Sequence, residues 1–296
     1  MGKKSFVGHA LALVTAIIWG VAFVATKNML GDYTPLEILL LRFIIGYVML
    51  WILYPHPMKI KRKVTELNLF LAGFTGVTLY FVCENTALEY TYASNVSLLV
   101  SAAPIFTGLL AMIFLKKEKM TKNFVLGFIC AMIGILLIGY NGSSVLELNP
   151  LGDLLALGAA ICWAVYSIFT MKADEEEGLN TLGVTRRIFF YGILTGLPVQ
   201  LITDGGIALQ PLTKMTNWTS LLLLAVFASA LGYVAWNKAM LILGTVRASA
   251  YIYFIPAVTM IASWLVLKEK ITYVMIIGAL LILGGLILSE KKQKGE

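Results

Sequence analysis

The sequence predicts an all-α polytopic membrane protein with ten transmembrane helices, arranged as two inverted five-helix repeats. Three observations lead to this fold class: an apolar composition, a series of stretches long enough to cross a bilayer, and a unit of sequence that occurs twice. Of the 296 residues, 59% are hydrophobic and 13% are charged. A soluble domain carries about 25% charged residues. The chain therefore lacks the polar surface that a water-soluble protein of this size needs.

Ten apolar stretches, joined by short connections, are the expected membrane spans. A helix needs roughly 17–25 residues to cross the hydrocarbon core. In chain order the spans are expected at residues 8–30, 34–54, 67–88, 91–115, 122–140, 152–172, 180–202, 218–241, 244–267 and 271–289. The first span is longer than the apolar region of a signal peptide and lacks a small-residue cleavage site, so we expect it to be retained.

The second half of the chain repeats the first. Residues 8–26 recur 144 positions later with nine identities, which include Trp19 and its counterpart Trp163. Offsets of 152 and 151 pair Asn85 with Asn237, Ser97 with Ser249, Pro104 with Pro256, Lys117-Glu118-Lys119 with Lys268-Glu269-Lys270, Gly127 with Gly278 and Gly134 with Gly285. We therefore expect two repeats, residues 1–145 and 146–296. Because each has an odd number of spans, the second is inverted, and a site is expected where the copies meet.

Positively charged residues predict the orientation, because cytoplasmic segments of membrane proteins are enriched in lysine and arginine. With the N-terminus in the cytoplasm, inner segments carry fifteen such residues, namely Lys3, Lys4, Lys59, Lys61, Arg62, Lys63, Lys116, Lys117, Lys119, Lys122, Lys172, Arg247, Lys291, Lys292 and Lys294. Outer segments carry four, Lys27, Lys214, Lys268 and Lys270. We therefore expect a multi-pass protein of the cell membrane with both termini in the cytoplasm. The net charge of +7 then needs no nucleic-acid partner.

Short motifs stand in a characteristic order in both halves. The first half contains Trp19-Gly20, Lys27, Pro35, Leu41-Arg42-Phe43, the stretch from Ala87 to Leu99, Pro104 and Lys117-Glu118-Lys119. The second contains the stretch from Ala239 to Ser249, Pro256 and the stretch from Leu267 to Thr272. In this order and spacing the motifs resemble two EamA-type domains of the drug/metabolite transporter superfamily. The resemblance implies a ten-helix carrier of small metabolites, often an exporter of amino acids or related solutes, and leaves the substrate open.

Aromatic and polar side chains within the spans are the candidate lining of a central cavity. Trp19 and Trp163 are mid-span, where a belt of interfacial aromatic residues does not account for them. Phe23 lies four residues after Trp19 and therefore on the same helix face. The substrate-binding candidates are Trp19, Phe23, Lys27, Arg42, Tyr80, Asn85, Ser97, Trp163, Tyr166, Arg186, Tyr233, Trp236, Asn237 and Tyr251.

Placing an ionisable group inside a membrane span costs free energy unless the group is paired or hydrated. Each such residue therefore calls for a structural or functional explanation. Lys27, Arg42 and Glu84 are predicted in the outer half of the membrane, and Arg186, the repeat counterpart of Arg42, toward the cytoplasm. One interpretation is a cationic cavity that grips a carboxylate, with Glu84 as a titratable gate. The alternatives are an ion pair of Glu84 with Lys27 or Arg42, snorkelling of Lys27 to the headgroups, and a positive-inside anchor at Arg186.

Pro104 and Pro256 are expected in the middle of the fourth and ninth spans, where each removes a backbone hydrogen bond. They can act as packing kinks, as flexing points of a gate, or as both. The paired glycines of the fifth and tenth spans lie seven residues apart and predict close helix packing. We expect these two helices to be peripheral to a cavity formed by helices 1–4 and 6–9.

Together these features predict a secondary transporter that exports small metabolites such as amino acids by alternating access through a central aromatic and cationic cavity. A lipid scramblase or flippase and an exporter of hydrophobic drugs are the alternatives. The sequence contains no nucleotide-binding glycine loop, catalytic constellation or metal-ligand spacing, so we expect no enzyme activity, metal or cofactor. A small-molecule solute and the lipid bilayer are the expected partners. Protons or another coupling ion, and the oligomeric state, are left open.

The charge asymmetry makes the orientation testable by labelling from outside the cell. In a variant without Cys83, Cys130 and Cys162, single cysteines placed at residues 142–150 or 204–216 should react with a membrane-impermeant maleimide in intact cells. Cysteines at residues 58–64 should react only after the membrane is permeabilised. Reaction at residues 58–64 in intact cells would reverse the predicted orientation.

Overall fold

The computed structural model describes residues 3–91, 93–115, 120–142, 149–203, 205–267 and 272–290, and every regular element in these ranges is helical. The first half contains α1 (Lys3–Met29), α2 (Pro35–Leu53), α3 (Lys63–Gly73), η1 (Phe74–Leu79), α4 (Tyr80–Tyr90), α5 (Ala93–Val100), α6 (Ala103–Phe114) and α7 (Lys122–Gly142). The second half contains α8 (Pro150–Glu177), α9 (Thr181–Thr203), η2 (Gln210–Thr213), α10 (Met215–Leu222), η3 (Leu223–Leu231), α11 (Gly232–Leu243), α12 (Thr245–Ala250), η4 (Tyr251–Phe254), α13 (Ile255–Leu267) and α14 (Tyr273–Glu290). The two Lys-Glu-Lys motifs, residues 117–119 and 268–270, lie outside the described residues.

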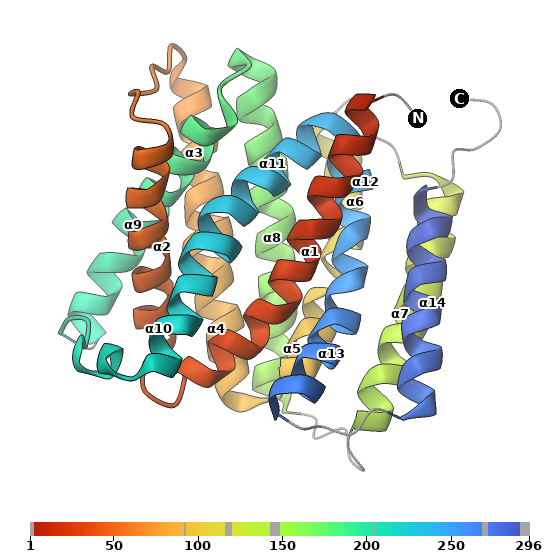
Figure 1. Ribbon diagram of the computed structural model, residues 1–296. Helices are drawn as coiled ribbons and strands as arrows, with labels where there is room; N and C mark the ends of the chain where they lie inside the picture. The colour runs from red at the N-terminus through yellow and green to blue at the C-terminus, as the bar shows by residue number, and fades with distance from the viewer. Residues whose placement is uncertain are drawn as a thin grey trace.

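Consecutive elements align into long rods that stand side by side (Figure 1). In the first half, α3, η1 and α4 form one rod, and α5 and α6 form another. In the second, α10, η3 and α11 form one rod, and α12, η4 and α13 form another. Within the described ranges, seven helices are long and apolar enough to cross a membrane, and α7 and α14 contain shorter apolar helices. The prediction of an all-α multi-pass membrane fold is confirmed.

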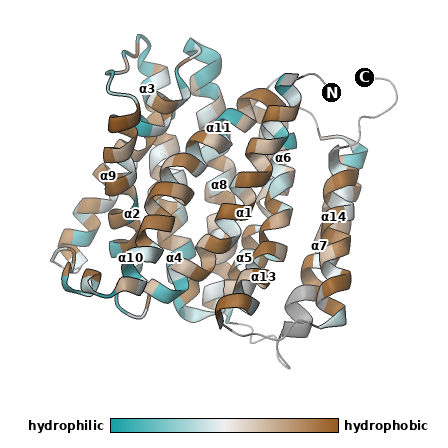
Figure 2. Cartoon of the chain, in the orientation of Figure 1, coloured by the Kyte–Doolittle hydropathy of each residue, from teal (hydrophilic) through white to brown (hydrophobic). Residues whose placement is uncertain are grey.

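The outer surface of the bundle is apolar, as contact with lipid requires. Ile52, Ile113 and Ile202 are exposed by 74%, 71% and 84%. Hydrophilic residues gather toward the ends of the helices (Figure 2). The beginning of α1 and the end of α14 lie at the same end of the bundle, which we call the terminal end (Figure 1).

Helix irregularities occur at matching places in the two repeats. The rod formed by α3 and α4 contains the π-helical segment η1. Its counterpart in the second half, formed by α10 and α11, contains the π-helical segment η3. The rod formed by α5 and α6 is interrupted between these two helices. Its counterpart, formed by α12 and α13, passes through the 3₁₀ segment η4. Inserted residues and breaks of this kind are often found at functional sites, where they redirect side chains.

The two prolines lie in the middle of their rods, as the sequence predicts, but at a change of helix type and not inside a regular α-helix. Pro104 lies in the first turn of α6, and Pro256 in the first turn of α13. The irregular segment before each proline, residues 101–102 before Pro104 and η4 before Pro256, accommodates a residue that has no N–H to donate and is well tolerated in the first helical turn. A gating role at these breaks stays a proposal.

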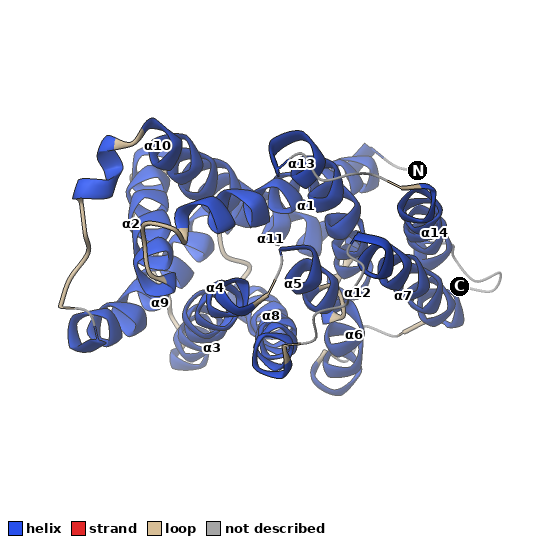
Figure 3. Cartoon of the chain, turned by 90° about the horizontal axis from the view of Figure 1, so that it is seen from below, coloured by secondary structure: helices blue, strands red, loops and turns tan. Residues whose placement is uncertain are grey.

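Helices α7 and α14 form a separate pair at one side of the bundle (Figures 1 and 3). Their backbones meet at glycines: a Cβ atom on Gly285 would lie 2.5 Å from the carbonyl oxygen of Gly127, and one on Gly134 would lie 2.4 Å from that of Gly278. Only glycine permits so close an approach of two helices in lipid. The peripheral position of the pair agrees with the sequence prediction.

Neighbouring glycines in α14 provide a matched test of this packing. Gly285→Ala should lower the thermal unfolding midpoint of the purified protein by several degrees, because overpacking a tight contact costs roughly 1–3 kcal/mol. Gly284→Ala, which meets nothing within 4 Å, should leave the midpoint unchanged or raise it slightly. Equal effects of the two substitutions would show that the pair is not held by the glycine contact.

Candidate functional site

An aromatic cluster occupies the place where the two repeats meet. The Trp19 ring of α1 contacts the Trp163 ring of α8 edge to face, with 4.9 Å between ring centroids. Trp236 of α11 lies 5.0 Å from Trp19, and Tyr166 of α8 lies 4.8 Å from Trp163. Tyr233, at the start of α11, contacts both Trp19 and Trp163. The repeat-related tryptophans therefore meet at the centre of the bundle.

A cavity of about 440 Å³ adjoins this cluster on the side away from the terminal end. Its walls come from both repeats, with Trp19, Ala22, Phe23, Arg42, Tyr80, Phe81, Glu84, Val100, Trp163, Tyr233, Ile252 and Ile255. Seven of these twelve residues were predicted from the sequence. The five that were not, Ala22, Phe81, Val100, Ile252 and Ile255, are apolar side chains that no sequence pattern distinguishes from ordinary packing.

Arg42 and Glu84 bring opposite charges to the same cavity. Arg42 is 2% exposed, its Nε donates to Ser229 Oγ at 2.9 Å, and its guanidinium lies 4.4 Å from the centre of the Phe81 ring. Glu84 is 5% exposed and is hydrogen-bonded by the Tyr80 hydroxyl. The ion pairs found among the described residues include neither of them. The charged groups of Arg42 and Glu84 are thus both buried at the wall of the central cavity.

Hydrogen bonds close the bundle between this cavity and the terminal end. The Tyr166 hydroxyl donates to Asn237 Oδ1, and Asn237 Nδ2 donates to Thr185 Oγ1 at 3.0 Å. The Tyr233 hydroxyl donates to the Gly76 carbonyl oxygen of η1 at 2.8 Å. We call Tyr166, Asn237 and Thr185 the polar seal. It joins α8, α9 and α11, and all three side chains are buried.

Several candidate residues lie outside the cavity lining, and the first three described below contact the protein itself through polar side-chain atoms. Lys27 Nζ donates to the carbonyl oxygens of Leu88 and Thr91 at the end of α4. Asn85 Nδ2 donates to the Pro35 carbonyl oxygen at 2.9 Å. The Tyr251 hydroxyl is 2.7 Å from His9 Nδ1. Ser97 and Trp236 are buried and do not line the cavity, and Pro104 and Pro256 are likewise absent from its walls.

Arg186 also lies outside the central cavity, although its repeat counterpart Arg42 lines it. Its guanidinium stacks on Trp51, 3.6 Å from the ring centre, and donates to the carbonyl oxygens of Tyr54 and His56. These contacts place it in a second cavity, of about 480 Å³, near the terminal end. The structure thus separates the two arginines that the sequence suggested would serve one transport path.

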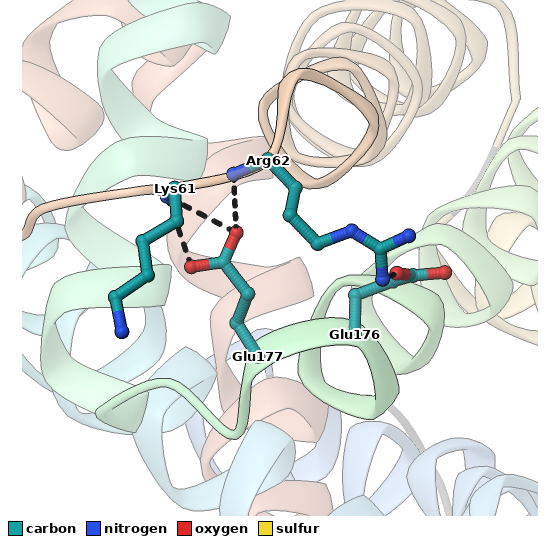
Figure 4. Close-up of polar contacts among 4 residues, drawn as sticks. All are labelled: Lys61, Arg62, Glu176 and Glu177. Atoms are coloured by element: carbon teal, nitrogen blue, oxygen red, sulfur yellow. Dashed lines mark hydrogen bonds and ion pairs between the residues drawn. The ribbon is translucent and has the colours of Figure 1, made fainter.

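The segment that Arg186 holds, residues 54–62, is fastened again at its other end. Glu177, the last residue of α8, accepts hydrogen bonds from the backbone N–H groups of Lys61 and Arg62, and the Arg62 side chain pairs with Glu176 (Figure 4). The acidic run at the end of α8 therefore fixes the connection between α2 and α3.

The indole N–H of Trp163 is buried and has no acceptor among the described residues, although the ring borders the central cavity. The ring, and not this N–H group, is what Trp163 is seen to present to the cavity. No group of three or more His, Cys, Asp and Glu side chains that could hold a metal ion occurs in the described part of the chain.

Comparison with known proteins identifies the family. A sequence model of the EamA-like transporter family matches twice, at residues 6–140 and 150–290. An uncharacterized transporter of Archaeoglobus fulgidus is 26% identical over 96% of this chain and 98% of its own length. A probable amino-acid metabolite efflux pump of Escherichia coli is 26% identical over 94% of this chain and 93% of its own. A solved crystal structure shares the fold, with a TM-score of 0.74 at 16% identity over 96% of each chain.

Proposed function

The chain belongs to the EamA-like transporter family, and on that premise we propose that it exports amino acids across the cell membrane by alternating access. Transport of a small solute by a multi-pass membrane protein follows from the family. The substrate class, the direction and the mechanism are our proposal, and they rest on one observation. Arg42 and Glu84, both buried, line a single cavity whose other walls are aromatic and aliphatic.

An amino-acid zwitterion matches the two charges of this cavity. Nε of Arg42 is used by Ser229, which leaves the N–H groups of its two terminal nitrogens for a carboxylate. Glu84 can accept from an ammonium group. A buried charge without a compensating partner is costly, so a zwitterion that satisfies both charges at once is favoured over a neutral solute.

The walls favour an apolar side chain on the amino acid. Trp19, Phe23 and Trp163 present aromatic surface to the cavity, and Ile252 and Ile255 present aliphatic surface. We therefore expect large apolar or aromatic amino acids to be transported better than small polar ones.

Alternating access is supported by a difference between the two sides of the aromatic cluster: one side has a cavity and the other is closed. The cavity lies on one side of the aromatic cluster, and the polar seal closes the other side. In an inverted-repeat transporter the second state exchanges the roles of the two halves around a fixed site. We propose that residues 1–145 and 146–296 are these halves, that the polar seal breaks when the cavity opens toward the terminal end, and that the breaks before Pro104 and Pro256 absorb the movement.

Export, and cytoplasmic termini, follow from two further arguments. The name of the relative in Escherichia coli describes efflux of amino-acid metabolites, and the distribution of lysine and arginine favours a cytoplasmic terminal end. If transport is coupled to protons, Glu84 is the carboxyl group in the cavity that can carry one. Neither export of neutral hydrophobic drugs nor lipid scrambling accounts for a buried charge of each sign in one cavity.

Transport by proteoliposomes tests the two charges separately. Arg42→Gln should raise KM for a zwitterionic amino acid about tenfold or more, because a hydrogen bond to a charged group is worth roughly 1.5–3 kcal/mol. The same variant should affect the corresponding amine, which lacks the carboxylate, far less. Glu84→Gln should show the reverse selectivity, sparing the analogue that lacks the ammonium group.

Lys214→Gln, which removes an exposed cation outside the cavity, is the matched control and should leave KM unchanged. Recovery of transport when Arg42→Gln and Glu84→Gln are combined would contradict the proposal, since it would show that the two residues only neutralise each other. So would equal losses for the zwitterion and the amine.

A further inference from the structure

The second cavity, at the terminal end, contains two arginines and shares no lining residue with the central one. It holds about 480 Å³ and is lined by Tyr47, Trp51, Pro57, Met58, Gly183, Arg186, Arg187 and Phe190. Its walls are the end of α2, the beginning of α9 and the segment that follows α2. In Figures 1 and 3, α2 and α9 lie at the edge of the bundle opposite α7 and α14. The cavity therefore borders the outer surface of the molecule.

The charge of Arg186 is buried and has no acidic partner in the described part of the chain. Arg186 is 5% exposed, and the two hydrogen bonds that it makes go to neutral carbonyl oxygens, those of Tyr54 and His56. Its neighbour Arg187 lies 3.5 Å from Glu66, so one carboxylate stands against two guanidinium groups. Each arginine keeps unused N–H donors. A buried cation without a counter-charge is costly, and an anion in the cavity would offset that cost.

The position of the cavity along the helices matches the level of lipid headgroups. Trp51 and Tyr54 lie at the end of α2, where interfacial aromatic residues collect. The segment beyond carries the exposed residues Lys59, Lys61, Arg62 and Lys63. Basic pockets between helices at this level suit the phosphate of an anionic lipid, which neighbouring lysines also attract.

An apolar stripe leads from the cavity toward the middle of the membrane. Phe190, which lines the cavity, is followed on α9 by Leu194, Leu197 and Leu201, at spacings of four, three and four residues. These spacings place the four side chains on one helix face, and all four are between 36% and 54% exposed. A soluble phosphate ester would use the arginines alone, whereas a phospholipid would also cover this stripe with an acyl chain.

We propose that the cavity between α2 and α9 binds an anionic phospholipid. The phosphate accepts hydrogen bonds from the free N–H groups of Arg186 and Arg187, and one acyl chain lies along the α9 stripe. Because Arg186 also holds the segment at residues 54–56, the bound lipid stabilises the connection between α2 and α3. This inference does not depend on the identity of the transported solute.

Native mass spectrometry of the detergent-purified protein measures this binding directly. Phosphatidylglycerol should bind more tightly than phosphatidylcholine, and sn-glycerol 3-phosphate should bind weakly. The double substitution Arg186→Gln with Arg187→Gln should weaken binding of phosphatidylglycerol by about tenfold or more. The matched control, Lys59→Gln with Lys63→Gln, removes the same charge from exposed positions at the same end and should retain tight binding.

Arg187→Gln alone decides the matter if variants of Arg186 do not fold, and it should still weaken binding of phosphatidylglycerol. Equal binding of the two lipids, or unchanged binding in all the arginine variants, would overturn the proposal. Binding of sn-glycerol 3-phosphate as tight as that of phosphatidylglycerol would assign the cavity to a soluble phosphate ester and would also overturn it.

Discussion

The cost of burying charge inside a bundle that faces lipid is the constraint on which the site depends. Arg42 is almost inaccessible, and its guanidinium is held by the Ser229 hydroxyl and the Phe81 ring. Ser229 lies in the π-helical segment η3, so the irregular helix and the buried charge belong to one arrangement. Glu84 supplies the opposite charge across the same cavity. Such groups persist inside a membrane only where partners or a polar ligand satisfy them, and the cavity provides room for such a ligand.

The two repeats share a fold, but equivalent residues in the two repeats make different contacts. Trp19 and Trp163 meet at the centre, as related residues near an inverted-repeat axis can. Asn85 binds a backbone carbonyl at one end, whereas Asn237 is part of the polar seal. Arg42 faces the central cavity, and Arg186 turns to Trp51 and the α2–α3 connection. These differences distinguish the side of the aromatic cluster that contains the central cavity from the side that the polar seal closes.

Much of the fold could be predicted because bilayer crossing demands long apolar stretches and the repeat is visible as matched residues. That Trp19 and Trp163 line the central cavity was expected from their mid-span positions in the two repeats, whereas the contact between their rings was not. The places of Lys27 and Arg186 could not be predicted, because each binds carbonyl oxygens that become free only where a helix ends. The π-helical segments left no signal in the sequence apart from a serine, Ser229, within an apolar span. Pro104 and Pro256 were correctly placed in the middle of their spans, but the irregular segment directly before each could not be predicted, because a sequence does not show where the helix type changes.

A structure of the protein determined with a saturating large apolar amino acid tests the central claim most directly. The carboxylate should lie within hydrogen-bonding distance of the terminal nitrogens of Arg42, the ammonium group beside Glu84, and the side chain among Trp19, Phe23 and Trp163. Density for the solute elsewhere, or a direct Arg42–Glu84 ion pair in a cavity without solute, would contradict the assignment of this cavity to amino-acid transport.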